Sequence, residues 1–360
     1  MTEAVQQAAP QTGPAPEDLA YQDEALQDVS RTFALTIPQL PEGLRTVVAN
    51  AYLLCRIADT IEDCERLTFP EKRAFYEQFF AAVEGEGDPQ AFAEGLYPRL
   101  EDSMLPGERK LIQQTPAVLR ITHSFGENDR AALSRCVRVM AKGMEAFQEA
   151  EPSEGLRDQR ELDAYCYYVA GVVGEMLTEL FCHHSEAIAA RRDELAPLAV
   201  SFGQGLQMTN ILKDIWDDLE REVCWLPRDT FADEGLDLGE LSGARGERAF
   251  EAGLERLVAR ARGHLENALE YTLTIPPSEK GVRQFCLWAI GMALLTLRKV
   301  HRSRGFTDGA SVKISRRSVR ATVAVSKAAG GYNGVLRILF RLLALRLPPP
   351  EPVNPAPPRD

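Results

Sequence analysis

The sequence predicts an all-α protein. Apolar residues recur at the three- and four-residue spacing of helices through long stretches, whereas strand-like alternation and a series of Asn-Gly hairpin turns are missing. We expect helices over about 43–64, 128–150, 159–182, 186–221, 246–273, 278–303 and 311–328. With 360 residues and a hydrophobic content of 45%, the chain can bury a substantial core.

The connections between these helices predict a single domain. Loop-like stretches lie near 84–89, 151–154 and 234–246. None of them has the length or composition of a domain linker. Residues 1–20 are rich in Gln, Ala and Pro without the regions of a signal peptide, and residues 348–360 are rich in proline. We therefore expect two disordered tails around a folded domain over residues 21–347.

Composition excludes several functions. A net charge of −12 argues against a nucleic-acid partner, because no surface for a phosphate backbone is implied. The seven cysteines are scattered without a C-x-x-C pair, which favours a reducing compartment, and we expect a cytoplasmic monomer. Zinc is not expected either, since the adjacent His183 and His184 point to different faces of a helix.

Two carboxylate clusters are the most informative feature of the chain. Asp59 and Asp63, and likewise Asp214 and Asp218, lie four residues apart in helical and largely apolar sequence, so each pair shares one helix face. Turned toward an interior, such carboxylates cost on the order of several kcal/mol each unless cations neutralise them. Mg²⁺ prefers oxygen ligands and is usually bound through a few carboxylates together with phosphates. The clusters therefore predict a magnesium-dependent diphosphate site.

The first cluster belongs to a longer polar stripe. Tyr52, Arg56, Asp59 and Asp63 follow steps of four, three and four residues, which places them within roughly 60° of arc. The stripe thus combines a phenol, a guanidinium and two carboxylates. A solvated polar face is the alternative interpretation, but the many apolar neighbours, such as Ile57, argue against it.

The second cluster continues in the same way. Gln207, Asn210, Asp214 and Asp218 fall within roughly 80° of arc and add two amides to two carboxylates. Apolar residues surround this stripe as well. We expect the two stripes to face each other across a polar pocket inside an apolar bundle.

Two further segments accompany the stripes. Ser30–Phe33 precedes the first cluster and includes Arg31, which either reaches a diphosphate or is an ordinary exposed arginine. Tyr165–Gly174 combines aromatic and small residues, and Gly171 and Gly174 cost helix stability unless something compensates. An apolar channel wall and a tight helix crossing both explain these glycines.

Together these segments resemble a known family. Ser30–Phe33, Tyr52–Asp63, Tyr165–Gly174 and Gln207–Pro227 are similar, in the same order, to motifs of the squalene and phytoene synthases. These are head-to-head prenyl transferases of the all-α isoprenoid synthase fold, a helical bundle with a central apolar channel. The resemblance covers about residues 21–330. A D-x-x-E-D pattern, a Tyr-x-x-x-Arg pattern, V-A-G-x-V-G and Q-x-x-N-x-x-x-D-x-x-x-D occurring together are highly specific.

The resemblance implies a role for particular residues. It implies magnesium ligands at Asp59, Asp63, Asp214 and Asp218, diphosphate contacts at Arg31 and Arg56, and proton handling by Tyr52 and Tyr165. It implies further substrate contacts at Ser30, Phe33, Val169, Gly171, Val173, Gln207, Asn210 and Phe285.

The implied reaction joins two farnesyl diphosphates to give presqualene diphosphate. Magnesium and arginine draw charge onto the leaving diphosphate, and aromatic walls shield the allylic cation from water. The segments at Tyr165–Gly171 and at Phe285-Cys286 resemble the branch that then reduces the intermediate to squalene with NADPH. In that branch a basic loop, here including Lys313, Arg316 and Arg317, helps to hold the cofactor phosphate, although a solvated loop is the competing interpretation. No G-x-G-x-x-G fingerprint occurs, so the cofactor site is not a Rossmann unit.

Two other functions remain open. One alternative is a non-reductive enzyme that makes phytoene, dehydrosqualene or hydroxysqualene, and the other is a catalytically silent isoprenoid-binding protein.

The chain departs from the family pattern in two places. The family's usual Gly-Arg pair after the second cluster is Glu222-Val223 here, with Arg221 as an imperfect substitute. A usual Pro-Gln pair is Ala289-Ile290.

The segment 335–347 bears on location. It is too short and too rich in arginine to cross a bilayer. Its leucines and arginines favour a helix that lies flat on the inner face of an anionic membrane, with packing in the core as the competing interpretation.

Overall fold

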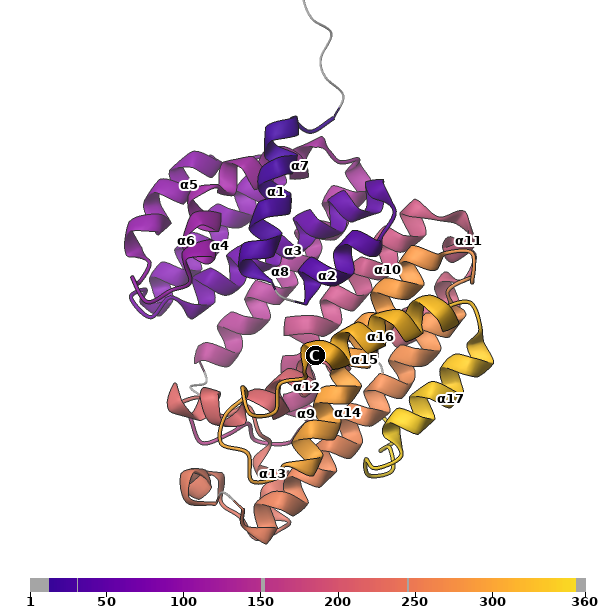
Figure 1. The fold of residues 1–360 in the computed structure, drawn as a ribbon. Helices are drawn as coiled ribbons and strands as arrows, with labels where there is room; N and C mark the ends of the chain where they lie inside the picture. The colour runs from indigo at the N-terminus through magenta and orange to yellow at the C-terminus, as the bar shows by residue number, and fades with distance from the viewer. Residues whose placement is uncertain (1–12, 31, 150–152, 245, 354–360) are drawn as a thin grey trace, which may run out of the picture. The chain divides into compact units, whose positions relative to one another are not determined.

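The computed structural model describes residues 13–30, 32–149, 153–244 and 246–353, and most of these residues are helical (Figure 1). Their helices are α1 Pro16–Val29, α2 Phe33–Thr36, α3 Glu42–Asp63, α4 Phe69–Glu84, α5 Pro89–Leu96, α6 Pro106–Gln113, α7 Thr115–Ser124, α8 Glu127–Glu149, α9 Gln159–Cys166, α10 Val172–His184, α11 Glu186–Ala189, α12 Arg192–Glu220, α13 Arg228–Ala232, α14 Arg248–Thr274, α15 Lys280–Arg302, α16 Arg316–Ala329 and α17 Asn333–Ala344. Within these ranges no strand forms, and only an isolated bridge joins Leu156 to Pro227. The all-α prediction is confirmed.

The chain folds into two compact units, where the sequence predicted a single domain without a linker. One unit holds residues 1–31 and 49–134, and the other holds residues 32–48 and 135–360. The chain passes between the units three times: between residues 31 and 32, ahead of α2, and then inside α3 and inside α8. Because the last two crossings lie within continuous helices, no change in composition marks them.

The first unit is built around the C-terminal part of α3. Leu53, Leu54 and Ile57 are fully buried there. The buried Asn50 side chain donates to the carbonyl of Val118 on α7 at 2.9 Å and accepts from the hydroxyl of Thr122 at 2.7 Å. A buried amide with partners on both sides fixes the position of α3 against α7, because losing either bond would leave a polar group without water.

The second unit is organised around α12. This helix packs against α10, α14 and α15, and α16 and α17 both lie on α15 (Figure 1). Three of the fully buried residues in this core are Leu195, Leu265 and Leu297, one from each of the long helices α12, α14 and α15.

Glycines allow the closest helix contacts of this unit. A β-carbon at Gly174 would lie 2.1 Å from the carbonyl oxygen of Ala199, and one at Gly203 would lie 2.0 Å from that of Ala170. No side chain fits at these separations. The tight-crossing explanation for the glycines of the Tyr165–Gly174 segment is therefore supported, since Gly174 belongs to that segment.

All the predicted helices are present, but two of them are divided. The stretch 159–182 contains α9, a π-helical turn at Tyr167–Gly171 and α10. The stretch 186–221 contains α11 and α12. π-helical turns are rare and occur often at functional sites, and this one coincides with an aromatic family motif. The sequence prediction missed α1, α2, α4, α5, α6, α7 and α13.

Parts of both expected tails are ordered. Helix α1 begins at Pro16, within the stretch 1–20 that we expected to be disordered, because proline suits the first turn of a helix. At the other end, the backbone N–H of Glu351 donates to the carbonyl of Ala259 at 3.1 Å, so this part of the expected tail 348–360 packs on α14. The stretches 1–12 and 354–360 lie outside the described residues. No described helix has the length and apolar character to cross a membrane.

We expect Gly203→Ala to destabilise the protein. The added methyl group meets backbone atoms of Ala170, which cannot rotate aside as the end of a side chain can. Overpacking of this kind costs about 1–3 kcal/mol. Gly43→Ala is the matched control, since Gly43 also lies in a helix but has nothing within 4 Å of the added atom. Urea unfolding followed by far-UV circular dichroism measures both variants. Equal midpoints would show that α12 and the π-helical turn have room to move apart.

Candidate functional site

The first polar stripe lies on α3, as its spacing predicted. Arg56 donates from Nη1 to Asp59 Oδ2 at 3.4 Å and from Nη2 to Glu108 on α6. Glu108 is buried, whereas Arg56 and Asp59 remain half-buried and Asp63 is exposed. The guanidinium is thereby held between two carboxylates at the edge of the core.

The carboxylates of this stripe carry more negative charge than their surroundings stabilise. Burial raises the pKa of Asp59 to about 7, with Asp63 adding to the shift and Arg56 opposing it. Burial, with Asp63 and Asp59, also raises the pKa of Glu62 well above its usual value. These shifts arise because charge is costly away from water and like charges repel. An added cation would stabilise the ionised forms.

Tyr52 stands at the other end of the same stripe. Its hydroxyl donates to the carbonyl of Val29, the last residue of α1, at 3.2 Å. Burial raises the pKa of the phenol, although Ser30 and Arg56 lower it in part. The phenol therefore keeps its proton at neutral pH and can donate a hydrogen bond.

The second polar stripe lies on α12. Lys213 pairs with Asp214 at 2.9 Å, and Arg221 pairs with Asp218 at 2.5 Å. Asp218 is buried, which raises its pKa to about 6, with Arg221 opposing the shift and Asp214 adding to it. Of the two amides, Gln207 is half-buried and Asn210 is exposed. Both stripes thus join partly buried aspartates to a cationic side chain of their own helix.

The loop between α15 and α16 packs directly against the second stripe. The backbone N–H of Gly309 donates to Asp217 Oδ2 at 3.2 Å. A β-carbon at Gly309 would lie only 2.5 Å from Asp214 Oδ1. Lys299 holds the same loop from α15 by donating to the carbonyls of Ser311 and Lys313, at 3.1 and 2.6 Å. A side chain at position 309 would therefore have to displace the carboxylates of Asp214 and Asp217.

The basic residues predicted to hold a cofactor follow this loop. Lys313, Arg316 and Arg317 are exposed, and both arginines lie in the first turn of α16, after the cap formed by Ser315. The exposed N–H groups of a helix N-terminus attract anions, and the adjacent guanidinium groups add to that attraction.

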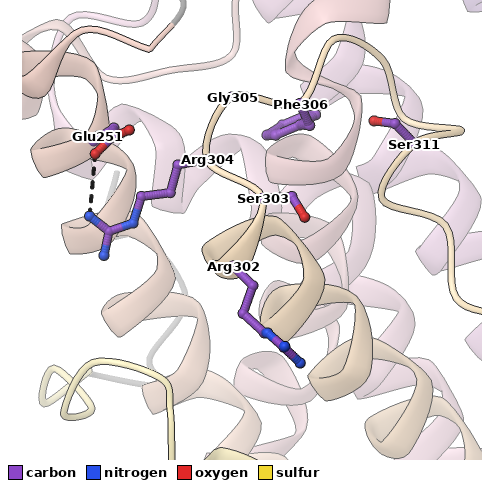
Figure 2. A pocket seen from close by; sticks show the side chains of 7 residues that line it. All are labelled: Glu251, Arg302, Ser303, Arg304, Gly305, Phe306 and Ser311. Atoms are coloured by element: carbon purple, nitrogen blue, oxygen red, sulfur yellow. Dashed lines mark ion pairs between the residues drawn. The ribbon is translucent and has the colours of Figure 1, made fainter.

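A surface hollow of about 530 Å³ lies beside this loop and holds none of the predicted site residues (Figure 2). Its lining residues are Glu251, Arg302, Ser303, Arg304, Gly305, Phe306 and Ser311. Arg304 reaches toward Glu251 on α14 and forms an ion pair with it at 3.6 Å, so the hollow's charges partly neutralise each other (Figure 2).

An aromatic cluster surrounds the predicted catalytic tyrosine of the second unit. The ring of Tyr165 stacks on Trp225 at 3.9 Å between centroids and meets Phe147 edge-on at 5.2 Å. Phe285 is buried, and its ring meets that of Phe181 edge-on with 6.2 Å between the ring centroids. Of the small residues in the motif, Gly171 is buried, whereas Val169 and Val173 are half-buried.

The remaining predicted residues are placed less informatively. Ser30 and Phe33 are half-buried, and they belong to different units. Arg31 lies outside the described residues. Among the described residues, no three Asp, Glu, His or Cys side chains come together closely enough to hold a metal ion by themselves.

Sequence reasoning missed four residues that shape the site. Glu108 is 52 positions along the chain from its partner Arg56, and Gly309 is 92 positions from Asp217. Phe147 precedes Tyr165 in the sequence and Trp225 follows it, yet both rings pack against that tyrosine. Only Trp225 lay within a stretch that the family motifs marked. No spacing rule links the other three to their partners.

The departure at Glu222 has a structural consequence. Glu222 has φ of 60°, in the left-handed region, directly after the end of α12. Glycine adopts this conformation without penalty, and helices commonly end with it there. The chain therefore has glutamate where both the family pattern and the backbone favour glycine, while Arg221 supplies a positive charge to Asp218.

The chain is similar in sequence to known proteins. Residues 26–318 match the family described as squalene/phytoene synthase, and the chain belongs to this family. The squalene synthase of Schizosaccharomyces pombe is 28% identical over 301 residues, which are 80% of this chain and 61% of that protein. The squalene synthase of Dictyostelium discoideum is 27% identical over 339 residues, which are 91% of this chain and 76% of that protein. The chain thus spans about three-fifths of the yeast relative.

Solved structures confirm the isoprenoid synthase fold. A structure of TcSQS with a bound ligand has a TM-score of 0.72 and 25% identity, and the match covers 92% of this chain and 93% of that one. A dehydrosqualene synthase in complex with a ligand has a TM-score of 0.65 at 21% identity, covering 87% and 96% of the two chains.

We expect Glu222→Gly to stabilise the protein. Removing the side chain relieves the left-handed conformation, which costs an ordinary residue about 1 kcal/mol. The control Glu222→Ala removes the charge but keeps a β-carbon, so it should bring no such gain. Thermal unfolding of both variants separates the two effects, and a gain of the same size in the alanine variant would attribute it to charge.

Proposed function

We propose that this protein is a squalene synthase. It would condense two farnesyl diphosphates head to head into presqualene diphosphate and reduce this intermediate to squalene with NADPH. The observation that carries the proposal is the pairing of partly buried motif aspartates with cationic side chains on both α3 and α12, within the range that matches the family. Such an arrangement suits the repeated departure of a diphosphate.

The donor set fits magnesium. Asp59, Asp63, Asp214 and Asp218 offer carboxylate oxygens, the ligand type that Mg²⁺ prefers. The raised pKa values of Asp59 and Asp218 show charge that a divalent cation would stabilise. Two aspartates on each of α3 and α12 suit a metal that completes its coordination with water and phosphate oxygens. When bound, the metal would withdraw charge from the leaving diphosphate.

The chain's own residues would perform the other steps. Arg56 is held by Asp59 and Glu108 in a position to bind a phosphate oxygen, and we propose the same role for Arg31. The protonated Tyr52 would donate to the departing diphosphate and relay a proton. The stacked rings of Tyr165 and Trp225 would shield a carbocation from water and stabilise it through their π-faces. Proposed substrate contacts are Ser30, Phe33, Val169, Gly171, Val173, Gln207, Asn210 and Phe285.

The reductive step would use the basic start of α16. Arg316 and Arg317 would bind the NADPH phosphates at the helix N-terminus, together with Lys313. The loop before them is attached to Asp217 through Gly309, which supports a cofactor close to the second stripe.

A non-reductive synthase is the second candidate. The observation in its favour is Glu222-Val223, which replaces a glycine and an arginine of the family pattern and so removes a positive charge beside the second stripe. Such an enzyme would release phytoene, dehydrosqualene or hydroxysqualene without the reductant.

Incubation with farnesyl diphosphate and Mg²⁺, with and without NADPH, tests the proposal. We expect squalene only when NADPH is present and presqualene diphosphate when it is omitted. Removal of Mg²⁺ with a chelator should abolish both products. An unsaturated or hydroxylated product that forms without NADPH would establish the second candidate. No turnover with any prenyl diphosphate would instead indicate a silent binding protein.

We expect Asp59→Asn and Asp214→Asn each to lower kcat roughly a hundredfold, because each removes a carboxylate ligand of the metal that would neutralise the departing diphosphate. Asp193→Asn is the control, since Asp193 is an exposed aspartate in the first turn of α12. Circular dichroism checks that all three variants fold. Full activity in the two stripe variants would remove these aspartates from the catalytic site.

We expect the double variant Arg316→Ala, Arg317→Ala to raise KM for NADPH roughly tenfold or more, since each lost phosphate contact weakens binding. Formation of presqualene diphosphate should stay at the level of the unmodified protein. Arg320→Ala, an exposed arginine further along α16, is the control. An unchanged KM in the double variant would place the cofactor elsewhere.

A further inference from the structure

The C-terminal part of the chain has a charge opposite to that of the whole. Residues 309–350 contain no aspartate or glutamate, in a protein whose net charge is −12. Their basic residues are Lys313, Arg316, Arg317, Arg320, Lys327, Arg337, Arg341 and Arg346. Because α16 and α17 both pack on α15, this positive charge is concentrated on one part of the second unit.

Helix α17, the yellow helix in Figure 1, has two apolar faces. Leu336, Phe340 and Ala344, at steps of four, are buried. On the opposite side a second apolar stripe consists of Val335, Ile338, Leu342 and Leu345, which are 45%, 57%, 55% and 72% exposed. One face of the helix therefore packs in the core, while the other presents apolar side chains at the surface.

The exposed stripe is presented by a helix that is anchored at both ends. Before its start, the buried Arg283 donates to the carbonyl of Gly330 at 2.7 Å and to the side chain of Asn333 at 2.6 Å. Beyond its end, Arg262 donates to the carbonyl of Pro348 at 2.7 Å. Docking through this helix costs little conformational entropy, because the helix is already formed and positioned.

We propose that α17 docks on an anionic phospholipid bilayer, with its exposed apolar stripe at the boundary between headgroups and acyl chains. Four large apolar side chains in one stripe exceed the scattered exposure of a normal surface, and a basic surround is typical of helices that lie in a membrane interface. Arg341 lies within α17, and Arg346 directly follows Leu345, so both can reach lipid phosphates.

A second copy of this chain fits the stripe less well. Self-docking through α17 would bring the basic segments of two copies together, and like charges across an interface oppose association. A bilayer with anionic headgroups offers both an apolar layer and the complementary charge. The overall charge of −12 makes this local basic segment necessary, since the remainder of the protein is repelled by such a surface.

Co-sedimentation of the full chain with vesicles tests the proposal. Vesicles of phosphatidylcholine alone are compared with vesicles that also contain phosphatidylglycerol, at low and high salt. We expect binding to the anionic vesicles only, weakened by salt. The double variant Ile338→Asp, Leu342→Asp should bind at least roughly tenfold more weakly, because two apolar side chains no longer insert. Leu105→Asp is the matched control, because Leu105 is 57% exposed but lies before α6 in the other unit.

The outcomes separate the possible occupants of the stripe. Equal binding by the double variant and by the Leu105 control would overturn the proposal, as would equal binding to neutral and anionic vesicles. Dimers that are lost in the double variant, without vesicle binding, would assign the stripe to a second copy. The membrane-docking proposal does not rest on the proposed function, because vesicle binding is measured without substrate. A thermal transition of the double variant equal to that of the unmodified protein would show that the variant is folded.

Discussion

The structure depends on how carboxylates that share a helix face are neutralised. Asp59 on α3 and Asp218 on α12 both carry raised pKa values, because burial removes water while neighbouring aspartates add repulsion. A neighbouring arginine partly neutralises each aspartate: Arg56 pairs with Asp59, and Arg221 pairs with Asp218. These internal cations let the protein fold with its acidic stripes partly buried, and the remaining charge is what suits the stripes to a divalent metal and a diphosphate.

Close backbone packing holds the second stripe in place. Gly174 and Gly203 bring α10 and the turn before it against α12, and the π-helical turn at Tyr167–Gly171 lies at this contact. Gly309 brings a loop from the far end of α15 onto Asp214 and Asp217. At Gly174 and Gly203 a side chain would meet backbone atoms, and at Gly309 it would displace the two carboxylates, so the positions of the aspartates follow from the packing of several elements.

Charge is also divided along the chain. The remainder of the chain contains the stripes and all the acidic residues, whereas the segment from Gly309 to Pro350 contains basic residues and no aspartate or glutamate. Its start is the loop that contacts Asp217, and its end is α17 with an exposed apolar stripe. One continuous basic segment thus connects the proposed cofactor site to the proposed membrane-facing helix, and Arg283 and Arg262 tie that helix to the core of the unit.

The sequence by itself determined the all-α class, most of the long helices, the two stripes and the family. These depend on local periodicity and on side-chain types at short spacing, which the order of residues contains directly. Only the tertiary structure decided that Glu108 holds Arg56, that Trp225 stacks on Tyr165 and that Gly309 meets Asp217. It also decided that the chain divides into two units, with two of the three boundaries inside continuous helices. Those features join residues far apart in sequence, or lie within unbroken helices, and no local pattern encodes them.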